Sequence, residues 1–347
     1  MLVDSPPEQC AETASAPPAH GPLRALGLLP GAVLLVLVAL ASIAVGAKAL
    51  APDQVWHGLF HATGTYGDVV VEQRLARTVL GLLAGAALGL AGAVLQALTR
   101  NPLADPGLLG INAGASAAVV TAITWFGVTS LTGYVWFAFG GAAAVGALVW
   151  FLGGSRDATP VRLALAGTAI SAALYGYLQA VMIMDDAALG RMRFWTVGSL
   201  ASANGPTITQ VLPFLAAGAL LALGLARPLN AVAMGDDTAR ALGARVHRTR
   251  MLAMLAATVL CGAATAACGP IAFVGLVVPH AVRSFTGPDL RWILPYAAVL
   301  SPVLLLGADV AGRIVARPAE LQVGIVTAIL GGPVFILLVR RRRTARL

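Results

Sequence analysis

Charged residues are scarce in this sequence, and lysine is almost absent. Only 11% of the 347 residues are Asp, Glu, Lys or Arg, whereas roughly a quarter of a soluble domain is charged. Apolar residues make up 58%, which excludes a disordered chain and argues against a soluble enzyme. The single lysine, Lys48, lies between two alanines, so the Gly-Lys-Ser/Thr motif of a P-loop ATPase is missing. The sequence therefore predicts a membrane protein that does not itself hydrolyse ATP in that way.

Cysteine and histidine are also few, and their spacing predicts no metal site. The cysteines lack the spacing of metal ligands, and Cys261 and Cys268 are seven residues apart in an apolar run, so we interpret both as packing residues on one helix face. The histidines do not cluster with Asp, Glu or Cys in apolar segments, which argues against a membrane-embedded enzyme. We therefore expect no catalytic residue, no metal site and no cofactor on this chain. The histidines are His20, His57, His61, His247 and His280.

Long apolar runs are abundant. A membrane-crossing helix needs about 20 apolar residues, so the composition allows at most about ten crossings. Ten segments fit, and they predict an all-α polytopic membrane protein, although the eighth is short and we expect a broken helix there. The segments are 29–50, 78–98, 108–126, 135–152, 163–184, 208–226, 251–267, 269–279, 293–313 and 323–339.

The distribution of basic residues predicts the topology. Ten crossings put both termini on one side, and if that side is the cytoplasm, the inner segments hold 16 of the 23 Lys and Arg residues and the outer segments hold 7. This asymmetry favours cytoplasmic termini in a multi-pass plasma-membrane protein. We expect residues 1–25 to be a disordered cytoplasmic tail, 26–343 the transmembrane domain and 344–347 the tail end.

Two patterns concern the packing of the predicted helices. Residues 102–108 and 270–276 are identical at four of seven positions at an offset of 168. This offset aligns the second predicted crossing with the seventh, and the two crossings would run through the membrane in opposite directions. Such inverted repeats are typical of transporters, although a chance match between two Gly- and Pro-containing breaks is the alternative. Gly81, Gly85 and Gly89 recur every fourth residue, with Gly92 close by, and predict a close approach of two helices.

Charged residues at the predicted outer surface allow two interpretations. Arg74 and Arg77 lie three apart on one helix face, where they could bind carboxylates of a docking partner or reach lipid phosphates. Asp309 and Arg313 are four apart, and we interpret them as a neutralised structural pair. Asp309 is the only acid well inside a predicted crossing, whereas a proton-coupled carrier would need buried acids without partners.

The cytoplasmic loop 229–243 predicts a short helix. Asp236, Asp237 and Thr238 favour a helix start, and Leu242-Gly243 favours its end. A short helix on the inner face is a surface that a soluble motor subunit could push on. An ordinary interfacial helix is the alternative, but this helix has little apolar area.

Taken together, the motifs resemble those of the FecCD/BtuC-type permeases, the membrane subunits of type II ABC importers for iron complexes, haem and cobalamin. Two segments are, in combination, highly specific for this family. The first is Asn101-Pro102-Leu103-Ala104-Asp105-Pro106, and the second begins with Gly269-Pro270-Ile271 and runs to Pro279-His280. The resemblance covers about residues 30–343 in the family's order. The other matching segments are 74–77, 91–96, 107–110, 163–167, 195–200, 229–243 and 323–328.

The resemblance implies a BtuC-like fold of ten helices with an inverted repeat, paired with a second copy or a paralogue. It also implies two ATP-binding cassette subunits, which hold ATP and Mg, and a periplasmic or lipid-anchored substrate-binding protein, with no nucleic acid partner. The family's docking arginines fall on Arg74, Arg77 and Arg313. Its inner gate falls on Asn101, Leu103, Pro160 and Val161. Its ATPase coupling loop falls on Met234, Gly235, Asp236, Asp237, Ala239, Leu242 and Gly243.

Two positions depart from the family pattern. Ala76 stands where the family usually has Pro, which should alter the helix start more than the charge. Pro160 and Val161 stand where relatives often carry small hydroxyl residues, so the second half of the gate is in doubt.

The sequence thus favours the permease subunit of an ATP-driven importer of ferric-siderophore or similar iron complexes. Import of cobalamin or haem by the same family is an alternative, since the cargo cannot be read from the sequence. An ion-coupled secondary transporter is the alternative from another class. The lack of unpaired acids inside the crossings and the predicted helix on the inner face both argue against it.

Overall fold

The computed structural model describes residues 21–46, 50–61, 64–153 and 160–344, and within them every regular element is a helix. In chain order the elements are α1 (Gly21–Leu26), α2 (Leu28–Ala44), α3 (Pro52–Phe60), α4 (Tyr66–Leu98), the 3-10 helix η1 (Pro106–Leu109), α5 (Ile111–Phe126), α6 (Leu131–Leu152), α7 (Pro160–Met184), α8 (Asp186–Trp195), α9 (Gly205–Gly224), α10 (Ala226–Ala233), α11 (Asp236–Ala241), α12 (Val246–Cys268), α13 (Val274–Thr286), α14 (Leu290–Val315) and α15 (Val323–Thr344).

Ten of these helices correspond to the ten predicted crossings. Among the described residues, seven helices are long and apolar enough to cross a membrane: α2 with the end of α1, α4, α6, α7, α9, α12 and α14. Two apolar helices are shorter, α5 with 16 residues and the Val323–Leu337 part of α15. The eighth predicted crossing is the 13-residue α13, preceded by the non-helical break at 269–273. The all-α polytopic fold predicted from the sequence is therefore confirmed.

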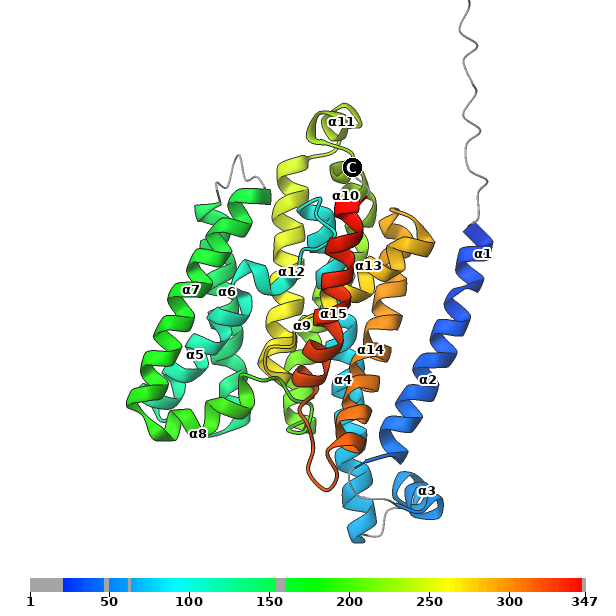
Figure 1. Ribbon diagram of the computed structural model, residues 1–347, viewed down its shortest axis with the longest axis vertical. Coiled ribbons are helices and arrows are strands. Elements are labelled where there is room, and N and C mark those ends of the chain that lie inside the picture. Colours follow the sequence, from blue (N-terminus) through cyan, green and yellow to red (C-terminus); the bar gives the residue numbers. More distant parts are fainter. Residues whose placement is uncertain (1–20, 47–49, 62–63, 154–159, 345–347) are drawn as a thin grey trace, which may run out of the picture.

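Helix α4 is the centre of the bundle (Figure 1), and its neighbours are α14, α12, α13 and α9. Its 33 residues include an unbroken buried run from Ala87 to Leu98, and most of α12 is buried as well. Helix α2 lies at the edge, where it contacts α14 and α4 and exposes most of its side chains. In a bilayer such exposed leucine and valine side chains face lipid, so the same apolar composition produces both central and peripheral helices.

The glycines of α4 allow the close helix packing that their spacing predicts. A Cβ atom on Gly85 would lie 2.6 Å from Pro302 Cα of α14, and one on Gly89 would lie 2.7 Å from the Ala297 carbonyl oxygen. At Gly92 the neighbour is the carbonyl of Gly275, at the start of α13. Because these neighbours are backbone atoms of α14 and α13, a side chain at any of the three glycines could fit only if a whole helix moved.

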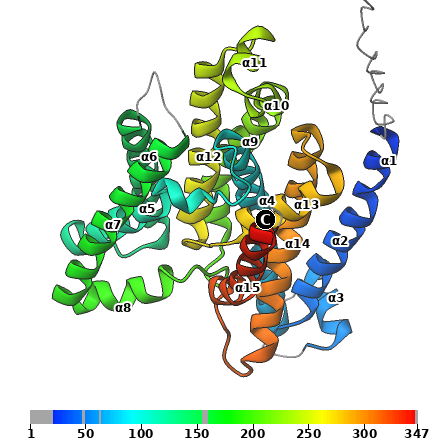
Figure 2. The same cartoon turned by 45° about the horizontal axis from the view of Figure 1, so that its top comes forward.

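The inverted repeat is also visible in the bundle. Helix α4 runs toward the end that carries α11, whereas α12 runs away from it (Figure 1). Each is followed by a short irregular segment and then by a helix that turns back, α5 after α4 and α13 after α12 (Figure 2). The two halves touch at their breaks, where the Gln96 side-chain amide donates to the Leu276 carbonyl at 3.1 Å.

Several boundaries differ from the sequence prediction, and the largest difference is at α4, which begins at Tyr66 and not at residue 78. Helix α2 ends at Ala44, not at residue 50, and Arg74 and Arg313 bind the carbonyls at its end. Residues 21–25 belong to α1, although we expected a disordered tail. Helix α13 continues to Thr286, beyond the predicted end at residue 279. Residues 1–20, in the predicted tail, lie outside the described residues.

Candidate functional site

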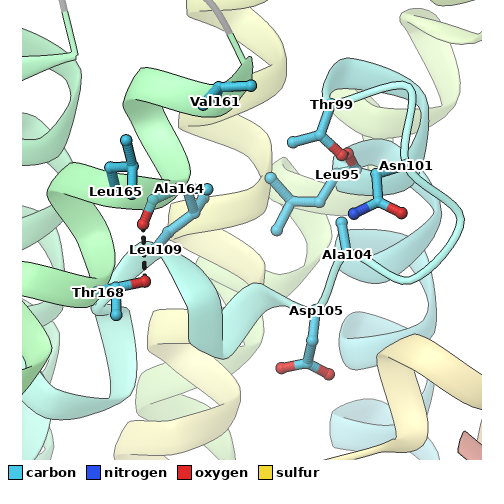
Figure 3. A pocket seen from close by; sticks show the side chains of 10 residues that line it. All are labelled: Leu95, Thr99, Asn101, Ala104, Asp105, Leu109, Val161, Ala164, Leu165 and Thr168. Atoms are coloured by element: carbon cyan, nitrogen blue, oxygen red, sulfur yellow. Dashed lines mark hydrogen bonds between the residues drawn. The ribbon is translucent and has the colours of Figure 1, made fainter.

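The predicted gate segments border one cavity of about 290 Å³ between the end of α4 and the start of α7 (Figure 3). We call it the α4–α7 cavity. Figure 3 shows α7 on one side and the loop after α4 on the other. Its lining is mostly apolar. The lining residues are Leu95, Thr99, Asn101, Ala104, Asp105, Leu109, Val161, Ala164, Leu165 and Thr168.

The loop between α4 and η1 has a defined local structure. Arg100 has a φ of 49°, which ends α4 in a conformation that few non-glycine residues adopt. The Asn101 side chain then accepts from the Leu103 amide at 3.0 Å, and the Asp105 side chain accepts from the Gly107 amide at 2.8 Å, which starts η1. These are side-chain turns of the kind that Asn and Asp favour. The loop is therefore held in one shape at the edge of the cavity.

The structure brings two of the four predicted gate residues together. Asn101 and Val161 both line the α4–α7 cavity, and both are exposed. Leu103 is half-buried and does not line it. Pro160 begins α7, but its side chain lies outside the described part of the chain. The gate role of all four residues stays a prediction.

The 229–243 segment folds as two short helices at one end of the bundle (Figure 1). Helix α11 begins at Asp236, as the sequence predicts, and Gly235 with a φ of 120° and Gly243 with a φ of 78° make the turns on either side. Ala239 is fully buried, whereas Met234 and Leu242 are 60% and 63% exposed. Two large apolar side chains thus project from the turns that flank α11, where a partner protein could contact them.

Two long-range contacts of Arg100 tie this segment to the loop after α4. Its guanidinium donates to the Val232 carbonyl at 2.9 Å and pairs with the carboxylate of Asp236. Arg250 of α12 donates to the same carboxylate at 2.9 Å. Desolvation acts to raise the pKa of Asp236, but the hydrogen bond from Arg100 and the charges of Arg250 and Arg100 outweigh it, so this pKa lies below the ordinary carboxyl value.

Arg100 is a residue whose position the sequence analysis missed. It stands directly before Asn101, and in the fold it connects the predicted gate with the predicted coupling loop. The sequence did offer one signal for this role, a basic residue directly before the Asn-Pro break. Its partner Asp236 is 136 positions away, so no local pattern could identify the contact.

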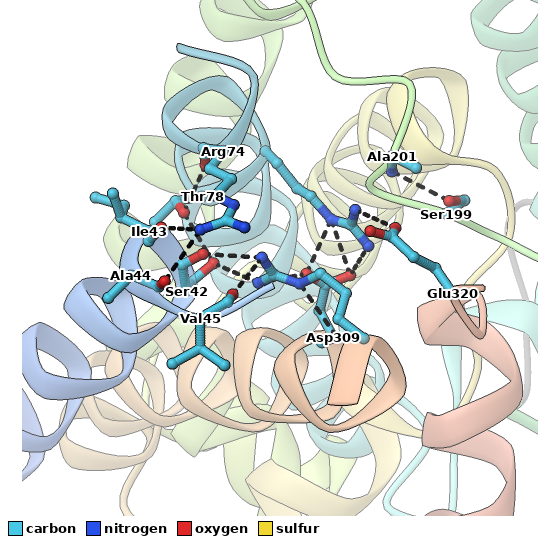
Figure 4. Close-up of polar contacts among 12 residues, drawn as sticks. Ser42, Ile43, Ala44, Val45, Arg74, Thr78, Ser199, Ala201, Asp309 and Glu320 are labelled. Carbon is cyan, nitrogen blue, oxygen red and sulfur yellow. Dashed lines mark hydrogen bonds and ion pairs between the residues drawn. The ribbon is translucent and has the colours of Figure 1, made fainter. Parts of the chain in front are cut away.

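At the opposite end of the bundle from α11, the three predicted docking arginines, Arg74, Arg77 and Arg313, form what we call the arginine cluster. Figure 4 shows Arg74 beside the end of α2, with Asp309 and Glu320 nearby. Arg74 donates to the Ile43 and Ala44 carbonyls at 3.0 Å. Arg313 donates to the Ser42 and Val45 carbonyls at 2.9 Å. The last carbonyls of a helix have no partner within it, so these guanidinium groups supply the missing donors at the end of α2.

The arginine cluster also contains the predicted acid-base pair. Asp309 is fully buried and lies 3.0 Å from Arg313, which confirms the structural interpretation of these two residues. The same carboxylate accepts from Arg77 at 2.7 Å. Arg77 further donates to the half-exposed Glu320 at 2.6 Å. Three guanidinium groups therefore share two carboxylates and the end of one helix.

The burial of this cluster differs from our expectation of outward guanidinium groups. Arg74, Arg77 and Arg313 are 6%, 8% and 1% exposed. They are buried because their acceptors lie on α2, α14 and the loop before α15, which close over the N-terminal part of α4. Their docking role stays a prediction, and it requires that a partner's carboxylates replace some of these acceptors.

Comparison with known proteins places the chain among transport proteins. The FecCD transport family matches residues 34–341. The chain is 49% identical over 320 residues to the ferric enterobactin transport system permease protein FepD of Escherichia coli, covering 90% of this chain and 95% of that protein. It is 38% identical to the hemin transport system permease protein HmuU of Yersinia pestis, covering 90% of this chain and 95% of the relative.

A solved structure has the same fold. It is described as an inward-facing conformation of a metal-chelate type ABC transporter, and it superposes with a TM-score of 0.80 at 27% identity, covering 91% of this chain and 99% of that chain. The shared fold therefore extends over almost the whole chain.

Proposed function

Because this chain belongs to the FecCD transport family, we propose that it is the permease subunit of an ATP-driven importer of ferric-siderophore or closely related iron complexes. The observation that carries the proposal is the 49% identity to a ferric enterobactin permease over nearly its full length. Haem is the second candidate cargo, because a hemin permease is 38% identical over a similar length.

In this proposal the chain conducts its cargo but performs no covalent chemistry. Two ATPase subunits supply the work, and they contact the exposed Met234 and Leu242 beside α11. The α4–α7 cavity belongs to the path, with Asn101 and Val161 at its inner gate. A bulky complex can pass along a mostly apolar lining without being bound tightly, as conduction requires.

The contacts of Arg100 give the coupling a physical route. Displacement of α11 by a partner would pull on Arg100 through Asp236 and the Val232 carbonyl. Because Arg100 directly precedes Asn101, the loop at the edge of the cavity would move with it. One guanidinium group thus joins the surface that receives the force to the segment that controls passage.

We further propose that the substrate-binding protein docks at the end of the bundle that holds the arginine cluster. Within the cluster three arginines share only two carboxylates, Asp309 and Glu320, and this local surplus of guanidinium groups suits a partner that offers carboxylates. The partner would compete with Glu320, which is half-exposed, for Arg77. Release of Arg77 from Glu320 would then transmit docking to the loop before α15.

The orientation belongs to the same proposal. Helix α1, α11 and the end of α15 lie at one end of the bundle (Figure 1), and we propose that this end faces the cytoplasm. The supporting observation is the surplus of arginine in the segments assigned to that side.

The decisive experiment is uptake into proteoliposomes. The chain is reconstituted with its ATPase subunits and binding protein, and uptake of a ferric catecholate, a ferric hydroxamate, ferric citrate and haem is measured with and without ATP. We expect ATP-dependent uptake of a ferric siderophore. ATP-dependent uptake of haem alone would select the second cargo, and accumulation driven by an ion gradient without any partner would contradict the proposal.

A further inference from the structure

A basic pocket lies where α6 ends and α12 begins, at the end of the bundle that carries α11. It has a volume of about 330 Å³ and borders neither the α4–α7 cavity nor the arginine cluster. Five of its seven lining residues are arginine or histidine, and none is acidic. The lining residues are Trp150, Arg240, Arg245, Val246, His247, Arg248 and Arg250.

Three elements bring these side chains together. Arg245 directly precedes α12, and Arg248 follows three residues later on the same face of that helix. Helix α11 contributes Arg240. From α6 comes Trp150, whose ring centre lies 5.8 Å from that of His247. An aromatic ring at the end of a crossing helix, beside cations, is typical of the membrane interface.

The pocket has more positive than negative charge around it. Arg250 is engaged by Asp236 at 2.9 Å, and Arg240 by Asp237 at 3.0 Å. Within the described part of the chain no ion pair forms on Arg245 or Arg248, and both side chains are exposed. Two guanidinium groups are therefore available to an anion, and guanidinium binds phosphate oxygens through paired hydrogen bonds.

Exposed apolar side chains follow the pocket along the same two helices. On α6 Phe151, which is 70% exposed, is next to Trp150 in the chain, and on α12 the exposed Met251 and Leu255 lie one and two turns beyond Arg248 on the same helix face. All three lie on helices that cross the bilayer. A free anion has no use for such a wall, whereas the acyl chains of a lipid would cover it.

We propose that this pocket binds the phosphate of an anionic phospholipid in the leaflet on that side of the membrane. Arg245 and Arg248 contact the phosphate, Trp150 lies at the level of the headgroup, and the acyl chains follow the exposed faces of α6 and α12. Basic pockets between crossing helices bind such headgroups in membrane proteins in general. The lipid would thus be attached beside α11, at the corner where α11 and α12 meet.

The test is native mass spectrometry of the purified full chain in neutral detergent, titrated with phosphatidylglycerol and, separately, with phosphatidylcholine of the same acyl chains. We expect preferential retention of phosphatidylglycerol. The double substitution Arg245→Gln with Arg248→Gln should weaken phosphatidylglycerol binding on the order of tenfold and leave phosphatidylcholine unchanged. The matched control Arg191→Gln with Arg193→Gln removes the same charge from exposed positions on α8, away from the pocket, and it should bind like the wild type.

The proposal would be overturned by equal retention of the two lipids or by an equal loss in the control variant. Displacement of phosphatidylglycerol by inorganic phosphate at similar concentration would also overturn it, because it would indicate a free-anion site. Loss of ATPase association with unchanged lipid binding would instead assign the pocket to a protein contact. The charge-preserving variant Arg245→Lys with Arg248→Lys guards against a folding defect, because it should keep the lipid preference, and a loss equal to that of the glutamine variant would contradict the inference.

Discussion

The two ends of the bundle use arginine differently. Beside α3, the arginine cluster is buried, and its guanidinium groups are satisfied by the end of α2, by Asp309 and by Glu320. Beside α11, Arg240, Arg245 and Arg248 remain exposed, and carboxylates engage only some of the basic side chains there. The first arrangement holds distant helices together, whereas the second leaves charge available to other molecules. Burial and the number of partners therefore separate arginines that another molecule can reach directly from those, as in the buried cluster, that must first give up an acceptor.

The largest effect should follow from removing the acid of the buried cluster. Asp309→Asn leaves Arg77 and Arg313 facing each other with only Glu320 as a charged partner, and breaking a buried ion pair in this way costs about 3–5 kcal/mol. We expect a strong fall in the thermal midpoint of the purified protein, read as the loss of the monodisperse peak on size exclusion after heating. An unchanged midpoint would mean that the cluster does not stabilise the fold.

The next effect concerns the contact that crosses from the exposed end to the cavity. Arg100→Gln removes the ion pair with Asp236 while keeping a polar side chain. The ATPase should therefore still bind, but its movement should be transmitted less efficiently to the loop between α4 and η1. We expect ATP-dependent transport to fall on the order of tenfold, a typical size for coupling between two sites. Arg291→Gln is the matched control, because that side chain is 58% exposed, pairs with Asp289 and lies outside both the 229–243 segment and the α4–α7 cavity, so it should leave transport near the wild-type rate.

A pH series sharpens the comparison at the same corner. The pKa of Asp236 is lowered in the fold. The stability that its carboxylate contributes is therefore fully present when the pH is above the ordinary carboxyl pKa, and it is lost as the pH falls through the lowered pKa of the folded state. Hydrogen exchange of residues 234–243, corrected for intrinsic rates, should therefore stay constant through neutral pH and rise only in strong acid. Asp236→Asn should abolish this acid-dependent step, and persistence of the step would assign it to another group.

The smallest effect is expected at the rim of the buried cluster. Glu320 is half-exposed, and exposed ion pairs contribute about 0–1 kcal/mol. Glu320→Gln should therefore shift the thermal midpoint far less than Asp309→Asn. If instead the two substitutions were equally damaging, the distinction between the interior of the cluster and its rim would be wrong.

The sequence predicted the features that depend on neighbours in the chain. Apolar runs located the ten crossings, the four-residue spacing identified the pair of Asp309 and Arg313, and the acids before Thr238 located α11. The family resemblance added the gate and coupling segments. It could not show that Asn101 and Val161 border one cavity, because that depends on how α7 packs against the end of α4.

Contacts between distant residues account for what was missed. The early end of α2 depends on Arg74 and Arg313, and the burial of Arg77 depends on an aspartate 232 residues away. The role of Arg100 depends on Asp236 in the same way. No periodicity in the sequence encodes such pairs. The sequence could therefore suggest which arginines have a role, but not whether other helices bury them.

The end of α2 has a consequence for how the protein is made. Arg74 of α4 binds the Ile43 and Ala44 carbonyls from about 30 residues further along the chain, whereas Arg313 binds the Ser42 carbonyl from 271 residues further along. The end of α2 therefore receives its second guanidinium group only after α14 has been synthesised, and until then α4 and lipid hold this helix. A product truncated before α14 would leave α2 less firmly attached to the bundle and more open to membrane proteases.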